Sequence, residues 1–318
     1  MSEEKIKVLT VVGPTAAGKT ALALALAKLL PDMEVVNADT VQVFRGLDVG
    51  TAKPTPAEQK LVRHHLVDVL DPITERPSAG WFAHQARRAI TEIRERGGIP
   101  VMVGGSGLYI SAALDGIADI PPIPPDVREE LRRELAAEGM PKLRAELATA
   151  DPQTMARIAF RDTQRTLRAL EVWRATKIPL SQWQMQATMT PWQGIIAGLD
   201  PERAVLYQRI DERLDAMFGG GLEEEVKRLL AQGADVEGAA LGALGYRHMA
   251  LYLMGATSRE QALRQAKLDS RHYAKRQLTY FRSMGHIRWW SIHPDKVAAI
   301  APEVADWFKS ESNSSAML

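Results

Sequence analysis

The fold of this chain is decided by one stretch, Gly13-Pro14-Thr15-Ala16-Ala17-Gly18-Lys19-Thr20, which matches the phosphate-binding pattern GxxxxGK[ST]. The apolar run 8–12 lies directly before it and predicts a buried strand. The Ala- and Leu-rich run 20–30 lies directly after it and predicts a helix. Strand, glycine loop and helix in this order are the context in which the pattern binds phosphate, so a glycine turn without a ligand is the weaker alternative.

Each part of this loop contributes to holding a polyphosphate. The glycines let successive backbone N–H groups converge on phosphate oxygens, and the start of the helix adds positive potential. Lys19 can neutralise phosphate charge, and the hydroxyl of Thr20 can ligate Mg²⁺, which is the expected cofactor. Such a loop binds a nucleoside triphosphate such as ATP in most proteins, but the motif recognises only a polyphosphate. The predicted phosphate-binding residues are Gly13, Pro14, Thr15, Ala16, Ala17, Gly18, Lys19 and Thr20.

Short apolar runs and helical segments alternate after the loop. Further strands are predicted at 34–38, 65–69, 100–103 and 194–199. A helix is predicted at 80–96, with Ser78 as its N-cap. This alternation predicts an α/β fold, with a parallel sheet flanked by helices as in the core of P-loop NTPases.

The alternation is interrupted at 121–125, where four prolines in five residues exclude a helix interior or a central strand. The segment 126–189 then has helical periodicity and is rich in Arg, Glu, Ala and Leu. We therefore expect an all-helical insertion domain at 121–190, within a core made of 1–120 and 191–318. The core is expected to end with a helical section at 203–282 and a frayed, Ser-rich segment at 309–318.

The composition limits what the protein can be. Among 318 residues, 46% are hydrophobic and 25% are charged, which is typical of a globular protein. The absence of cysteine excludes disulfides, thiolate nucleophiles, iron–sulfur clusters and thiolate zinc sites. No apolar run has membrane-spanning length, so we expect a cytoplasmic protein without a signal peptide and without a membrane partner.

Asp39 follows the predicted strand 34–38, and in a phosphate-loop sheet that strand end faces the same crevice. Its carboxylate could accept a proton from an attacking group, and Thr40 and Gln42 beside it could bind a polar acceptor. A helix cap or Asx turn is the structural alternative. Asp68 is only a weak candidate for the second aspartate of a motor ATPase, which argues against a machine driven by hydrolysis.

Positive charge is concentrated near the C-terminus, although the chain carries 40 Lys and Arg against 39 Asp and Glu. Tyr273, Tyr280 and Phe281 lie among these charges, as on surfaces that follow a phosphate backbone and stack unpaired bases. For any single charge, a solvated helix face is the better explanation; for the cluster we favour RNA contact. The cluster consists of Arg259, Arg264, Lys267, Arg271, Lys275, Arg276, Arg282 and Arg288, and the insertion adds Arg157, Arg161, Arg165, Arg168 and Arg174.

Together, several segments resemble the tRNA dimethylallyltransferases, also called tRNA isopentenyltransferases. The match runs in order from about residue 8 to 290, and its most specific parts are 46–54 and 275–282. The matching segments are 13–20, Asp39-Thr40-Val41-Gln42-Val43-Phe44, Gly46-Leu47-Asp48-Val49-Gly50-Thr51-Ala52-Lys53-Pro54, His64-His65-Leu66-Val67-Asp68, Gly104-Gly105-Ser106-Gly107-Leu108-Tyr109, 164–172, Gly245-Tyr246-Arg247 and Lys275-Arg276-Gln277-Leu278-Thr279-Tyr280-Phe281-Arg282.

The resemblance implies transfer of a dimethylallyl group from dimethylallyl diphosphate to N6 of the adenosine immediately 3′ of the tRNA anticodon, with release of diphosphate. The phosphate loop would hold the diphosphate with Mg²⁺. Lys19, Thr20 and Arg213 would stabilise the charge that develops as the allylic C–O bond breaks. Asp39 would accept the proton of the adenine amine as the general base.

The resemblance also implies residues that contact the anticodon stem-loop, and a monomer is expected. This chain departs from the usual pattern at Thr40, Phe44, Ser106 and 159–161, and it has no zinc-finger extension like that of eukaryotic members, so a bacterial-type enzyme is expected. The implied contact residues are Asp39, Thr40, Val41, Gln42, Ser106, Arg128, Gln164, Arg165, Thr166, Leu167, Arg168, Gly242, Gly245, Tyr246, Arg247, Lys275, Arg276, Gln277 and Arg282.

Three other functions use part of the same evidence. A small-molecule kinase would bind ATP on the loop and use Asp39 for an acceptor hydroxyl, but it has no use for the basic segment 275–282. A nucleotide-gated RNA-binding module would bind tRNA without forming a covalent product. A prenyltransferase for free adenine nucleotides has the closest chemistry, but it would not need the insertion.

Overall fold

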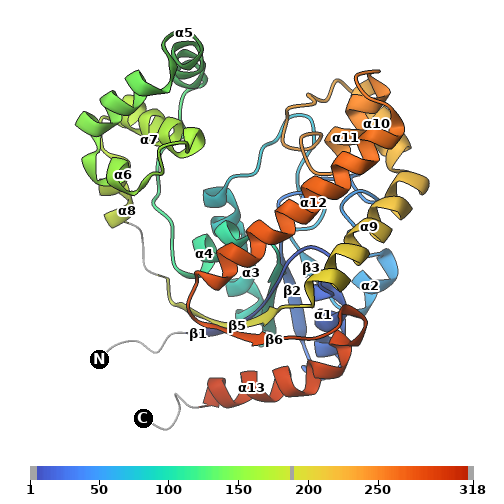
Figure 1. Cartoon of the computed structure of the whole chain (residues 1–318). Coiled ribbons are helices and arrows are strands. Elements are labelled where there is room, and N and C mark those ends of the chain that lie inside the picture. The colour runs from blue at the N-terminus through green and yellow to red at the C-terminus, as the bar shows by residue number, and fades with distance from the viewer. Residues whose placement is uncertain (1–5, 187–189, 314–318) are drawn as a thin grey trace, which may run out of the picture. The chain divides into compact units, whose positions relative to one another are not determined.

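The computed structural model of the protein describes residues 6–186 and 190–313 (Figure 1). The chain divides into two compact units. The α/β unit joins the chain before residue 116 to the chain after residue 189, and the helical unit consists of residues 116–189. The sequence had placed the limits of the helical insertion at 121 and 190. Across the described ranges, no helix is both long and apolar enough to cross a membrane.

In its described residues, the α/β unit contains one parallel sheet of six strands, in the order β3-β2-β4-β1-β5-β6. The strands are β1 (Ile6–Val12), β2 (Met33–Ala38), β3 (His64–His65), β4 (Ile99–Gly104), β5 (Trp192–Leu199) and β6 (Ile287–Trp290). β1 is central, with Thr10 opposite Met102 of β4 and Ile196 of β5. The predicted α/β fold with a parallel sheet is therefore confirmed. Because the strands are parallel, their carboxyl ends share one edge of the sheet.

Helices cover both faces of the sheet because the strands are apolar on both sides. Along β1, Leu9 and Val11 belong to one core, and Val8 and Val12 belong to the opposite one. The first core is completed by α1 (Lys19–Ala27), the 3₁₀ helix η1 (Pro294–Ile300) and α13 (Ala301–Asn313). The second is completed by α3 (Ala79–Glu95) and α4 (Gly107–Leu114).

A third core lies in the helical C-terminal section, which packs around the segment 43–70. Phe44, Leu47 and Tyr246 are completely buried there. The contributing helices are α9 (Arg203–Gly219), α10 (Leu222–Ala231), α11 (Tyr246–Leu253) and α12 (Arg259–Arg282). The short α2 (Pro56–Leu61) has no buried residue and contacts α1. Figure 1 shows α12 as the long orange helix that runs beside α9.

Two details differ from the sequence-based fold. The strand predicted at 65–69 is reduced to β3, because Leu66 and Asp68 take left-handed φ values of 62° and 58° and turn the chain. The segment predicted to fray from residue 309 instead continues α13 to Asn313, while 314–318 lie outside the described residues. β6 and most of α13 were not predicted; Trp290 and Trp307 pack between them at a ring distance of 5.5 Å.

The helical unit consists of α5 (Pro125–Ala150), α6 (Pro152–Arg157), α7 (Thr163–Thr176) and α8 (Leu180–Met185) in its described part, so it is helical as predicted. Residues 187–189 lie outside the described ranges. α5 is broken at Gly139, whose φ of 77° is not helical, directly before the turn that contains Pro141. Leu131, Leu147 and Leu170 form the centre of its core.

Arg174 on α7 is an internal cation of the helical unit. Its guanidinium donates hydrogen bonds of 2.6–2.9 Å to the carboxylates of Glu134 and Glu146. These two partners raise the pKa of Arg174 above its ordinary value. The sequence-based prediction that Arg174 belongs to an RNA-contacting cluster is therefore corrected, since its charge is neutralised within the unit.

Replacing Arg174 with Ala is expected to lower the free energy of unfolding of the helical unit by about 1–3 kcal/mol, because Glu134 and Glu146 would lose their shared cation. Hydrogen exchange of α5 and α7 measures this loss in the intact chain. Arg165→Ala is the matched control on the same helix, since Arg165 is 73% exposed, and its effect is expected to stay within about 0.5 kcal/mol. Equal protection in both variants would contradict the structural role of Arg174.

Candidate active site

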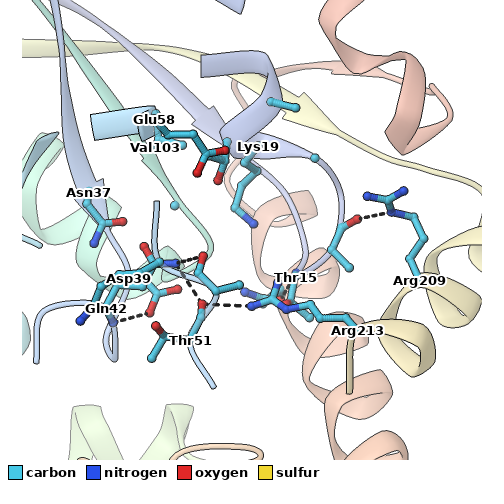
Figure 2. Close-up of a pocket in the computed structure, with 18 of the residues that line it drawn as sticks. Thr15, Lys19, Asn37, Asp39, Gln42, Thr51, Glu58, Val103, Arg209 and Arg213 are labelled. Carbon is cyan, nitrogen blue, oxygen red and sulfur yellow. Dashed lines mark hydrogen bonds between the residues drawn. The ribbon is translucent and has the colours of Figure 1, made fainter. Parts of the chain in front are cut away.

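The carboxyl ends of β1, β2 and β4 bring three segments of the chain together. β4 lies between β1 and β2, with Gly104 opposite both Val12 and Ala38. The phosphate loop therefore meets Asp39 at the same edge of the sheet, across the end of β4. A cavity of about 720 Å³ opens there, and Figure 2 shows Thr15, Lys19, Asp39 and Arg213 around it.

The loop after β1 has the backbone of an anion site. Gly18 has a φ of 92° and directly precedes α1, which begins at Lys19. A side chain at Gly18 would be strained, and its Cβ would lie 2.8 Å from a methyl group of Val297. Glycine is therefore needed at this position for both conformation and space. The first N–H groups of α1 have no partner within the helix, and these are the groups that the sequence predicts to bind an anion.

The ammonium group of Lys19 is held inside the loop. Its Nζ donates to the carbonyl oxygens of Gly13 at 3.0 Å and Pro14 at 2.8 Å. Burial lowers the pKa of Lys19 to about 8, although the charge of Asp39 acts in the opposite direction. An anion bound in the cavity would favour the charged ammonium, so Lys19 is suited to neutralising phosphate.

Helices α9 and α12 support the loop from the C-terminal section. Gln277 on α12 accepts a hydrogen bond from the N–H of Thr15 at 2.8 Å and donates to the carbonyl of Gly105 at 2.9 Å. Arg209 on α9 donates to the carbonyl of Ala16 at 3.3 Å. Gln277 thus joins the ends of β1 and β4. Gln277 is buried and both ends of its amide are engaged, so it supports the loop in this structure, while its predicted contact with tRNA stays a prediction.

Asp39 has one oxygen in a turn and the other free for chemistry. Oδ1 accepts hydrogen bonds from the N–H groups of Val41 at 2.8 Å and Gln42 at 3.2 Å, so the Asx turn considered as an alternative is present. Oδ2 has no hydrogen-bond partner among the described residues. The turn therefore orients the carboxylate through Oδ1 and leaves Oδ2 without a hydrogen bond.

Arg213 projects from α9 toward Asp39. Its guanidinium donates to the carbonyl of Thr51 at 3.0 Å (Figure 2). Burial lowers the pKa of Arg213, and the charge of Asp39 opposes this effect. Arg209 lies four residues earlier and also lines the cavity. Sequence reasoning missed Arg209, although its spacing places it on the same helix face as Arg213.

A second cavity of about 390 Å³ shares Asp39 and Arg213 with the first. One wall is apolar, and Tyr273 and Arg276 line it as well. The apolar residues include Ile210, Leu214 and Met217 of α9. Burial and the charge of Asp39 raise the pKa of Tyr273 to about 12, so its hydroxyl stays protonated. The first cavity is thus lined by cations and the second is more apolar, and the carboxylate of Asp39 lines both.

Part of the predicted tRNA-contacting set lines the second cavity, namely Asp39, Thr40, Val41, Gly242 and Arg276. The other predicted contacts of the α/β unit lie elsewhere. Gln42 donates to the carbonyls of Thr51 and Ala52. Gly245 has a φ of 86° and directly precedes α11. Arg247 pairs with Glu237, Arg282 pairs with Asp200, and Lys275 is exposed.

Three predicted contacts have buried side chains. Tyr246 and Thr166 are completely inaccessible, and the Thr166 hydroxyl donates to the carbonyl of Asp162. Ser106 is 8% exposed at the start of α4. Contact of these three residues with tRNA stays a prediction, and in this conformation their side chains are packed inside the protein.

The helical unit carries the other predicted contacts. Arg128 and Arg168 both pair with Glu171, at 3.6 Å and 3.3 Å. Gln164 and Arg165 are exposed on α7, whereas Leu167 packs against the core of the unit. The polar residues of this group are therefore accessible on the surface of that unit.

The side chains around the first cavity fit Mg²⁺ bound together with a polyphosphate. Thr20, Asn37 and Asp39 line it and offer oxygen ligands. Among the described residues, no cluster of three or more His, Cys, Asp or Glu side chains could hold a metal alone. Mg²⁺ usually takes one or two protein oxygens and completes its shell with phosphates and water. The donor set matches that arrangement.

Comparisons with known proteins agree with this geometry. The family model described as IPP transferase matches residues 42–284. The chain is 44% identical to tRNA dimethylallyltransferase 1 of Trichlorobacter lovleyi, over 96% of this chain and 99% of that protein. It is 45% identical to the tRNA dimethylallyltransferase of Syntrophobacter fumaroxidans, over 89% and 83%.

Solved structures show the same relationship. The crystal structure of the tRNA isopentenylpyrophosphate transferase of Bacillus halodurans has a TM-score of 0.71 and 37% identity, over 98% of this chain and 99% of that chain. A eukaryotic dimethylallyltransferase captured acting on tRNA has a TM-score of 0.75 and 25% identity, over 90% and 74%. With this likeness along nearly its whole length, the chain belongs to the IPP transferase family of tRNA dimethylallyltransferases.

Proposed function

We propose that this enzyme transfers the dimethylallyl group of dimethylallyl diphosphate to N6 of the adenosine immediately 3′ of the anticodon in tRNA. The observation that carries the proposal is the position of Asp39 and Arg213 between an anion cavity and an apolar cavity. A bond forms between N6 and the allylic carbon, the C–O bond to diphosphate breaks, and the N6 proton leaves.

The phosphate loop and two cations would stabilise the leaving diphosphate. N–H groups at the start of α1 would bind its oxygens, with Lys19 and Arg213 on either side. These donors are already placed in the cavity, so they need little rearrangement as negative charge develops on the departing oxygen. Mg²⁺ ligated by Thr20 would neutralise part of the diphosphate charge.

Asp39 would be the general base. The lone pair of an adenine amine is delocalised into the ring, so N6 is a weak nucleophile until its proton is removed. Oδ2 of Asp39 would accept this proton, while Oδ1 stays in its turn. The second cavity would receive the unstacked adenosine, with Arg276 and Tyr273 beside it.

The tRNA anticodon stem-loop would contact both units of the chain. In the α/β unit, Lys275, Arg276 and residues 39–42 would contribute, and in the helical unit Arg128, Gln164, Arg165 and Arg168. Lys275 and Arg276 form no ion pair within the described residues, and Arg276 lies over the ring of Tyr273. We expect the enzyme to work as a monomer in the cytoplasm.

The direct test of the function is mass spectrometry of tRNA incubated with the enzyme, dimethylallyl diphosphate and Mg²⁺. A dimethylallyl group on the adenosine 3′ of the anticodon is the expected product. Turnover that required ATP instead would favour a kinase, and tight tRNA binding without a covalent product would favour an RNA-binding module.

Asp39→Ala is expected to lower turnover by about 10²–10⁴-fold, the usual contribution of a general base. Asp39→Asn is the sharper variant, because its amide oxygen can keep the turn to Val41 and Gln42 while the basic oxygen is lost. Single-turnover rates and tRNA affinity separate chemistry from binding. We expect similar rate losses in both variants with tRNA affinity little changed; a near-normal rate in Asp39→Asn would remove Asp39 from proton transfer.

Replacing Lys275 and Arg276 with Gln is expected to weaken tRNA binding and to flatten its dependence on salt. Each lost phosphate contact should reduce the slope of log affinity against log salt by about 0.7–0.9. Arg264→Gln is the control on the same helix, since Arg264 is 69% exposed and adjoins Glu260. If the double variant keeps the wild-type slope, these two residues form an ordinary solvated surface.

A further inference from the structure

Glu225 is a buried carboxylate outside the two cavities. It lies in the first turn of α10 and is 7% exposed. Oε1 accepts hydrogen bonds from the N–H groups of Asp48 at 2.9 Å and Val49 at 2.8 Å, and Oε2 accepts one from Gly50 at 3.3 Å. The hydroxyl of Tyr246 donates to Oε2 at 2.6 Å. One side chain therefore receives four donors from distant parts of the sequence.

The segment 48–50, which Glu225 binds, is followed directly by Thr51, which lines both cavities. Gly50 lies flat against the Tyr246 ring, since an added Cβ would come within 2.3 Å of it. The next residue, Thr51, accepts the guanidinium hydrogen bond of Arg213 with its carbonyl oxygen. The same carbonyl accepts the amide of Gln42 at 3.1 Å. The position of this oxygen therefore depends on how residues 48–50 are anchored.

Other side chains also anchor this segment, and within it the hydroxyl of Thr51 donates to the carbonyls of Leu47 at 2.6 Å and Asp48 at 3.2 Å. Lys53 donates to the carbonyl of Phe44 and to the carboxylates of Asp48 and Asp68. Arg228 donates to the carbonyl of Gly46 at 2.6 Å. These groups bind carbonyl and carboxylate oxygens, whereas the N–H groups of residues 48–50 donate to Glu225.

We propose that Glu225 is a positioning residue. By holding residues 48–50, it fixes the carbonyl of Thr51, which in turn orients the guanidinium of Arg213 toward the diphosphate. The inference rests on the proposed function and adds a residue that touches no substrate. A carboxylate suits this task because every atom it presents is an acceptor, whereas an amide would turn an N–H group toward these donors. Four satisfied hydrogen bonds also explain why a buried acidic side chain is tolerated here.

The test is a double-mutant cycle between Glu225→Gln and Arg213→Ala, with kcat and the affinity for inorganic pyrophosphate and Mg²⁺ as readouts. Loss of one preorganised donor costs roughly 10²–10³-fold in kcat, so we expect about 10–100-fold for Glu225→Gln and more for Arg213→Ala. The KM for tRNA should change less than about twofold. With Arg213 already replaced, Glu225→Gln should cost less than about threefold, because residues that act as one unit are not additive.

Two further variants make the cycle decisive. Glu224→Gln changes the same helix at a side chain that is 77% exposed, and it should match wild type. If Glu225→Gln does not fold, Gly50→Ala replaces it, since its added methyl group displaces the segment from Tyr246. This variant should show the same non-additivity with Arg213→Ala.

Full additivity, an unchanged kcat, or a loss confined to the KM for tRNA would overturn the proposal. A wild-type chain that makes no prenylated tRNA would reject the function, and pyrophosphate affinities would still decide the role of Glu225.

Discussion

The site depends on two sources of positive potential at the carboxyl edge of the sheet, the ammonium of Lys19 and the first N–H groups of α1. Burial lowers the pKa of Lys19 to about 8, and the nearby guanidinium of Arg213 acts in the same direction. Such an arrangement is costly until an anion enters, because positive charges and helix N–H groups share a poorly solvated space. The carboxylate of Asp39 is the nearby counter-charge. A polyphosphate would complete the balance, and this is the physical basis for assigning the cavity to a diphosphate group.

The helical C-terminal section serves as the frame of this cavity. Gln277 fastens the phosphate loop to the end of β4, Arg209 holds the carbonyl of Ala16, and Glu225 anchors the segment before Thr51. Each of these side chains comes from a different helix and forms hydrogen bonds with the backbone of a loop. Loops that lack secondary structure are thereby fixed, as a site must be if it is to stabilise charge without rearranging.

Local basic charge is a poor guide to the surface that meets RNA. Arg271 pairs with Asp211, Lys267 with Asp215 and Arg174 with two glutamates, so much of the positive charge is neutralised inside the protein. Such pairing reduces the electrostatic field available to a phosphate backbone. Lys275 and Arg276 form no ion pair within the described residues, and both side chains are exposed.

Short-range patterns were enough to predict the phosphate loop, its flanking strand and helix, and the alternation that is typical of a parallel sheet. Asp39 was also predictable, since it directly follows an apolar strand. Only the packing of the whole chain shows that Tyr246 and Thr166 face inward, that Gln277 supports the loop, and that β6 joins the sheet beside β5. Packing also brings Glu225 into hydrogen-bond contact with residues 48–50, which lie far away in the sequence. The physical reason is that local periodicity reports which face of an element is apolar, whereas the partners of a polar side chain depend on which segments packing brings together.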